Sequence, residues 1–82
     1  MTVKGVNMLD RNIFSERFKT LRLNKNLTMV DIAKSLNISK QSVHEWQTRK
    51  TAPSIDKFVE LADYLGVSLD YLVGRSDDPA RR

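Results

Sequence analysis

The sequence predicts an all-α domain of five short helices. Apolar residues recur at helical spacing, and Phe14, Phe18 and Leu21 fall on one face of the first expected helix. Serine or threonine stands just before four later apolar segments, where its hydroxyl can cap the first backbone N–H groups of a helix. No segment alternates between apolar and polar residues as a half-buried strand does. With 82 residues, 40% of them hydrophobic and 29% charged, the chain is expected to form one globular domain.

The first two helices are delimited by caps and by asparagines. The first helix is expected to begin near residue 12 or 13 and to end near residue 24, followed by Lys25 and Asn26, since asparagine tolerates a left-handed exit. Thr28 should cap the second helix in a capping box with Asp31. That helix should stop at Asn37, again a residue that accepts a positive φ.

The other three helices have equally plain boundaries. Ser39 should cap a helix over 40–47, Ser54 a helix over 55–65, and Ser68 a helix over 69–73. Gly66 and Gly74 should end the last two. The helix over 55–65 is expected to turn five residues inward: Ile55, Phe58, Leu61, Ala62 and Leu65. The resulting organisation is an N-terminal arm over 1–12, a helical domain over 13–74 and a flexible tail over 75–82.

Charge is divided unevenly along the chain, whose net charge is +4. Residues 17–50 carry eight basic against two acidic side chains, and residues 51–80 carry two basic against six acidic ones. A basic half joined to an acidic half suits a surface that binds a polyanion and is backed by a scaffold, although an evenly solvated surface is the alternative. The chain has no cysteine, and no apolar run reaches the roughly 18 residues of a membrane span. A cytoplasmic protein without membrane contact is expected.

The second and third helices should pack against each other across a short turn. Six apolar residues take the positions that two crossing helices bury: Ile32, Ala33, Leu36, Ile38, Val43 and Trp46. Ala33 is small enough for a close approach of the second helix, and Asn37 fits the left-handed turn. An arbitrary helical hairpin is the alternative, but it would not require all these features together.

This stretch resembles the Cro and phage-repressor type of helix-turn-helix, also called the Xre family. The matching text runs RLNKNLTMVDIAKSLNISKQSVHEWQ from Arg22 to Gln47, and continues in APSI at 52–55 and LADYLGVSLDYLVG at 61–74. The resemblance covers roughly residues 14–74. It implies a five-helix, lambda-repressor-like domain that binds double-stranded DNA as a bacterial or phage regulator, typically a repressor and a homodimer on a near-palindromic operator.

The resemblance also implies a role for single residues. Four residues of the third helix should approach base edges: Lys40, Gln41, His44 and Glu45. Six should meet phosphates: Ser42, Thr48, Arg49, Lys50, Thr28 and Met29. The chemistry agrees, because glutamine can pair with adenine, lysine can donate to guanine and glutamate can accept from cytosine. Small hydroxyls, backbone N–H groups and loop cations suit phosphate oxygens.

Three positions depart from the pattern of the family. Met29 replaces the usual glutamine at the start of the second helix, so that a phosphate contact there should be lost or made by a backbone N–H. Gln47 replaces a glutamate that usually pairs with an arginine, so that Arg22 should make only a charged–neutral hydrogen bond. Arg49 replaces the glycine that usually ends the third helix, which should cost about 1 kcal/mol in a left-handed conformation.

Other functions have less support in the sequence. His44 is the only histidine, which leaves a metal site or a catalytic pair without a partner, and no cofactor, small-molecule effector or enzymatic activity is expected. The carboxylates of Asp56, Glu60 and Asp63 suit a solvated helix face. A protein-interaction module of the antitoxin or anti-repressor kind is the competing reading, but the outward face of the third helix is polar. For a dimer, the candidate surface comprises five residues: Leu69, Tyr71, Leu72, Val73 and Tyr64.

Overall fold

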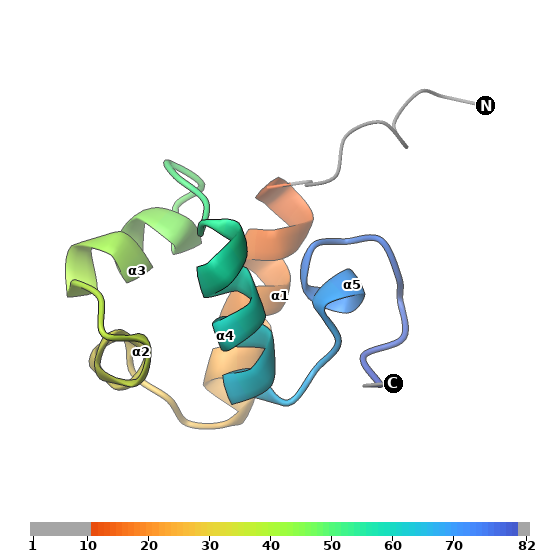
Figure 1. Cartoon of the computed structure of the whole chain (residues 1–82), viewed down its shortest axis with the longest axis horizontal. Helices are drawn as coiled ribbons and strands as arrows, with labels where there is room; N and C mark the ends of the chain where they lie inside the picture. The colour runs from red at the N-terminus through yellow and green to blue at the C-terminus, as the bar shows by residue number, and fades with distance from the viewer. Residues whose placement is uncertain (1–10, 81–82) are drawn as a thin grey trace.

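The computed structural model describes residues 11–80 and contains five helices in chain order (Figure 1). They are α1 (Arg11–Asn24), α2 (Met29–Leu36), α3 (Lys40–Gln47), α4 (Ile55–Leu65) and α5 (Leu69–Leu72). The all-α prediction is confirmed, and residues 11–80 include no strand. The arm was expected to extend to residue 12, yet α1 already begins at Arg11, while residues 1–10 lie outside the described part.

Four helices begin with the caps that the sequence predicts. Each capping hydroxyl accepts the backbone N–H three residues on: Thr28 from Asp31, Ser39 from Ser42, Ser54 from Lys57, and Ser68 from Tyr71. At α2 the Asp31 carboxylate also accepts the backbone N–H of Thr28 at 2.8 Å, which completes the capping box. These bonds satisfy N–H groups that have no partner inside the helix.

A residue with positive φ follows each of the five described helices, one or two positions after its last residue. These residues are Asn26, Asn37, Arg49, Gly66 and Gly74, with φ between 56° and 89°. At each end, the next residue donates its N–H to a carbonyl five positions back, for example Ile38 to Ala33 and Lys50 to Glu45. This is the Schellman arrangement, in which the last helical carbonyls gain partners. The predicted left-handed conformations of the two asparagines and of Arg49 are confirmed.

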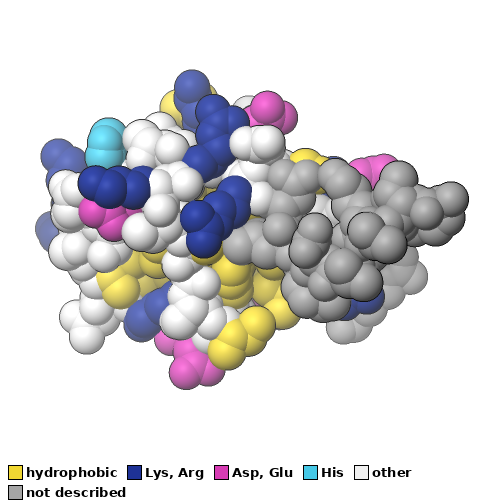
Figure 2. Space-filling view, turned by 90° about the horizontal axis from the view of Figure 1, so that it is seen from above, with side chains coloured by type: hydrophobic (Ala, Val, Ile, Leu, Met, Phe, Trp, Pro, Cys, Tyr) yellow, Lys and Arg dark blue, Asp and Glu magenta, His cyan; other side chains and the backbone are white. Residues whose placement is uncertain are grey.

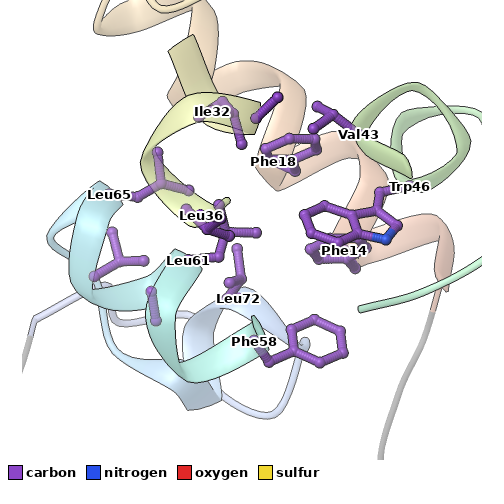
Figure 3. Close-up of a cluster of buried hydrophobic side chains, with 13 residues drawn as sticks. Phe14, Phe18, Ile32, Leu36, Val43, Trp46, Phe58, Leu61, Leu65 and Leu72 are labelled. Atoms are coloured by element: carbon purple, nitrogen blue, oxygen red, sulfur yellow. The ribbon is translucent and has the colours of Figure 1, made fainter. Parts of the chain in front are cut away.

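The core joins all five helices around a cluster of aromatic rings (Figure 3). Phe14 stacks on Phe18 with ring centroids 5.7 Å apart, and it meets the edge of Phe58 at 5.0 Å. Phe18 in turn contacts Trp46 edge to face at 6.2 Å. The rings therefore connect α1 to both α3 and α4, so that the position of α3 depends on this core.

One expected core residue is not buried. Ile55 was expected to face inward, but it is 70% exposed. It is the first residue of α4, where a helical side chain leans toward the N-terminus and projects past the end of the helix. Pro53, just before the cap, is buried at this end of the helix, and the other four inward residues of α4 lie in the core as expected.

Residues 75–80 are joined to the domain by hydrogen bonds. Arg17 of α1 donates to the carbonyls of Tyr71 and Ser76 at 2.6 and 2.7 Å, and it pairs with the carboxylate of Asp77 at 2.8 Å. The guanidinium also lies 4.1 Å from the centre of the Tyr71 ring. The backbone N–H of Ser68 donates to the Pro79 carbonyl. Residues 75–80, which the sequence assigns to a flexible tail, thus have hydrogen-bond partners in α1 and at Ser68.

The capping box predicts a pH dependence of stability. The backbone N–H of Thr28, and then its hydroxyl, lower the pKa of Asp31 from its ordinary value of 3.8. A lowered pKa in the folded state means that this stabilisation is complete above the unfolded value and is lost as the pH falls through the folded value. We expect Asp31→Asn to be less stable than the wild type near pH 7, with the difference shrinking below about pH 4.

Urea unfolding of both proteins at about pH 7 and about pH 3 measures this difference. Glu16→Gln is the control, because Glu16 is an exposed carboxylate in the interior of α1. A gap between Asp31→Asn and the wild type that stays constant with pH would contradict the assignment.

Candidate nucleic-acid interface

Helices α2 and α3 form the predicted pair of packed helices. Ile32, Ala33 and Leu36 of α2 are buried together with Val43 and Trp46 of α3, as the spacing predicts. Ile38, in the turn, is partly buried against the same core. Asn37 makes the turn between the helices with φ 57° and ψ 50°. The inner faces of the pair are therefore occupied by packing.

A buried serine of α1 fixes the end of α3. The hydroxyl of Ser15 donates to the Trp46 carbonyl at 2.8 Å, and Ser15 is only 5% exposed. This bond satisfies one of the last carbonyls of α3. This bond could not be predicted from the sequence, because Ser15 and Trp46 are 31 positions apart and nothing local links them. The only indication in the sequence is a small polar residue beside Phe14 on the inner face of α1.

A second contact between α1 and α3 was expected and is present. The Arg22 Nε donates to Oε1 of Gln47 at 3.2 Å, the predicted charged–neutral hydrogen bond. The same guanidinium donates to the Leu27 carbonyl at 3.0 Å. Arg22 therefore ties the loop after α1 to the last residue of α3.

A lysine of α4 contacts the end of α2, and this contact could not be predicted from the sequence. The Lys57 ammonium donates to the carbonyl of Leu36, the last residue of α2, at 2.8 Å. It also pairs with Glu60 one turn later at 3.3 Å. A positive charge at the C-terminus of a helix is favourable, so Lys57 stabilises the end of α2 just before the turn.

The outward face of α3 is polar. Lys40, Gln41 and His44 are exposed, and Glu45 is partly buried. The four expected base-contacting residues therefore lie together on one helix of eight residues. Basic side chains gather around the histidine on the surface seen in Figure 2, with little hydrophobic area between them. Such a face offers donors and acceptors without an apolar patch that would favour a protein partner.

Two of the four side chains are already held in place. The Gln41 Nε2 donates to Oε2 of Glu45 at 3.1 Å, and the Thr51 hydroxyl donates to Oε1 of Glu45 at 3.4 Å. Lys40 and His44 have no such side-chain contact in the described part of the chain. The face thus combines two exposed side chains, Lys40 and His44, with a hydrogen-bonded pair.

The loop after α3 is shaped by Glu45 and exposes its cations. The Glu45 carbonyl accepts the N–H groups of Lys50 and Thr51 at 2.9 and 3.3 Å, and the Thr48 hydroxyl at 3.3 Å. Arg49 has φ 68°, and its guanidinium donates to Oδ1 of Asn12 at 2.9 Å. Arg49 and Lys50 are both exposed next to the end of α3.

The other expected phosphate contacts are arranged differently. The Met29 side chain packs against the core, which leaves its backbone N–H, in the first turn of α2, as the group that can face a ligand. Thr28 is exposed just before it, with its hydroxyl accepting from Asp31. The Ser42 hydroxyl lies 3.0 Å from that of Ser39. Thr28 and Met29 thus lie at the start of α2, and Ser42 lies in the first turn of α3.

Two further features of residues 11–80 concern metal binding and membrane spans. No group of three histidine, cysteine, aspartate or glutamate side chains there could hold a metal ion. None of the described helices has the length and apolar character needed to cross a membrane.

Comparison with known proteins finds a helix-turn-helix family match and several relatives that are transcriptional regulators. A match to the helix-turn-helix family spans residues 18–72. The uncharacterised HTH-type transcriptional regulator YobD of Bacillus subtilis is 36% identical over 67 residues, which are 82% of this chain and 60% of that protein. The prophage-derived regulator YonR of the same organism is 31% identical over 74% of this chain and 56% of its own length.

A solved structure shows the same likeness. The crystal structure of a transcriptional regulator from Listeria innocua superposes with a TM-score of 0.71 at 34% identity, over 74% of this chain and 57% of that one. This chain therefore spans between 56% and 60% of the length of these three relatives. Together with the packed α2–α3 pair and its polar outer face, these matches show that the chain belongs to the Xre or Cro type of the helix-turn-helix family.

Proposed function

We propose that the protein is a sequence-specific transcriptional regulator, acting as a repressor, that inserts α3 into the major groove of a near-palindromic operator. The observation that carries the proposal is the contrast between the two faces of α3. The inner face is fixed by Val43, Trp46 and the Ser15 hydrogen bond, while the outer face presents polar side chains. A helix that is packed on its inner face and polar on its outer face is what reading base edges requires.

The outer side chains supply complementary chemistry for base pairs. Lys40 can donate to guanine O6 or N7, and Gln41 can both donate to and accept from adenine. His44, one turn after Lys40, can donate or accept according to its tautomer. Lys40, Gln41 and His44 form the proposed base-reading set, and Glu45, which the resemblance also assigns to it, is hydrogen-bonded to Gln41 on the same face.

Phosphate contacts would hold the helix in its register. The loop cations Arg49 and Lys50 follow α3 directly, with Thr48 and Ser42 as smaller donors. The exposed start of α2, at Thr28 and Met29, offers a hydroxyl and a backbone N–H at the positive end of a helix dipole. Such contacts fix orientation and carry no sequence information themselves.

We further propose that two copies bind one operator, because a single small domain reads only one half-site. The proposed dimer surface differs from the one predicted from the sequence. Leu72 is excluded, because it is fully buried in the core. Tyr64 is retained, and Ile55 and Val59 of α4 are added as exposed apolar residues. Val59 also borders a groove of about 360 Å³ between α4 and α5. Sedimentation with and without operator tests this; a monomer in both cases would contradict it.

Selection of bound duplexes from a random pool tests the function itself. We expect enrichment of one motif with two related halves whose centres are about 10 bp apart, or a multiple of that spacing. An enrichment of no sequence would contradict sequence-specific binding and favour a protein-interaction module.

Replacing Lys50 should weaken binding to all sequences alike. Its exposed ammonium lies beside the end of α3, and each phosphate contact contributes to the release of counterions. We expect Lys50→Ala to lower the slope of log K against log salt by about one unit. Arg75→Ala removes the same charge from the segment after α5 and should leave the slope unchanged. An unaltered slope for Lys50→Ala would remove this residue from the phosphate set.

A further inference from the structure

The hydrogen bond between Gln41 and Glu45 determines which way the Gln41 amide faces. The amide nitrogen lies 3.1 Å from Oε2 of Glu45 and donates to it. The opposite orientation would place the amide oxygen against the carboxylate, where two acceptors repel each other. The Gln41 amide is therefore oriented before any ligand arrives.

The Glu45 carboxylate has a second hydrogen-bond partner, which helps to keep it in place beside the Gln41 amide. The Thr51 hydroxyl donates to the other carboxylate oxygen at 3.4 Å. Thr51 in turn is placed by its backbone N–H, which donates to the Glu45 carbonyl at 3.3 Å. Glu45 is also less exposed than Gln41. The carboxylate thus lies behind the amide, between α3 and the loop that follows it.

In this orientation the hydrogen-bond donor and acceptor of the Gln41 amide match those of only one purine base. One N–H is used by Glu45, which leaves the second N–H and the amide oxygen to face outward. Adenine presents N7 as an acceptor and its N6 amino group as a donor, which matches this pair. Guanine presents two acceptors, N7 and O6, and would place O6 against the amide oxygen with a carboxylate behind it.

We propose that Glu45 is a positioning residue that makes Gln41 selective for adenine over guanine, rather than a residue that reads a base of its own. This inference rests on the proposed function, since it assigns a role within the base-reading face. It differs from the role that the family resemblance implies for Glu45. Without the carboxylate, the Gln41 amide can rotate and donate to guanine as well.

The test is a set of selections from a random duplex pool, performed with the full chain. The variants are Gln41→Ala, Glu45→Ala, Glu45→Gln and the double variant Gln41→Ala/Glu45→Ala. The base pair whose preference disappears in Gln41→Ala is the Gln41 position. Circular dichroism and the fluorescence of Trp46 establish that each variant is folded. Affinity for a non-specific duplex provides the reference for binding that does not depend on sequence.

We expect Glu45→Ala to lower the preference for adenine over guanine at the Gln41 position about tenfold, with the other positions unchanged. Glu45→Gln keeps an acceptor and should retain part of the preference. In the Gln41→Ala background, removal of Glu45 should change no base preference. A merely structural role for Glu45 would weaken binding to all sequences and leave the preference intact, which overturns the inference.

Two other results would also overturn it. One is a loss of preference in Glu45→Ala at a different base pair, which would show that Glu45 reads its own base. The other is a wild-type preference for a base other than adenine at the Gln41 position. If the wild type enriches a motif and Glu45→Ala enriches the same motif with the same base preferences, only this inference is overturned. A wild type that enriches nothing overturns the proposed function together with it.

Discussion

Phe18→Ala is expected to lower the free energy of unfolding by about 3–5 kcal/mol, a typical cost for truncating a buried phenylalanine. Phe18 is fully buried, and its ring lies between those of Phe14 and Trp46. The substitution removes both ring contacts and leaves a cavity where α1 meets α3. A domain of this size has a total stability of roughly 4–12 kcal/mol, so the loss is a large part of it.

Urea unfolding followed by the fluorescence of Trp46 measures this loss, because the chain contains a single tryptophan. Leu23→Ala is the matched control, since Leu23 lies on the same helix and is 54% exposed. We expect the control to change stability by at most about 0.5 kcal/mol. A loss below about 1 kcal/mol for Phe18→Ala would contradict the description of the core.

Gln41→Ala is expected to weaken binding to the selected operator by roughly 1–3 kcal/mol while leaving non-specific binding nearly unchanged. The Gln41 side chain is exposed and makes its described contact only to Glu45, so the fold should be unaffected. The loss arises because the partner base is left without its bidentate hydrogen bonds. Titrations of operator and random duplex at one fixed salt concentration give both affinities.

The control for Gln41→Ala is Thr20→Ala, which also shortens an exposed polar side chain but lies in the second half of α1. It should leave both affinities unchanged. An equal loss on operator and random duplex would show that Gln41 contributes to general attraction and not to sequence reading.

The sequence predicted the local features of the fold well. The caps at Thr28 and Ser39 and the left-handed turn at Asn37 depend on residues within a few positions of one another. The periodic pattern likewise placed Val43 and Trp46 in the core. Such features need no knowledge of the tertiary structure, because the geometry of a single helix determines them.

Features that depend on distant residues were not predicted. The Ser15–Trp46 and Lys57–Leu36 hydrogen bonds connect different helices. Neither a serine nor a lysine indicates in the sequence which distant residue it will contact. Ile55 was wrongly placed in the core because the spacing rule treats the first turn of a helix like its middle. The Gln41–Glu45 pair lies at helical spacing, but the contribution of Thr51 depends on the path of the loop.

The proposal that α3 reads DNA sequence through its outer face is tested most directly by changing one of its side chains and observing which base changes. Gln41→Lys places a donor-only side chain where an amide stands, and lysine prefers guanine. In a selection from a random duplex pool, we expect adenine to be replaced by guanine at one position in each half-site, with all other positions retained. An identical motif for wild type and variant would contradict the proposal that α3 reads DNA sequence.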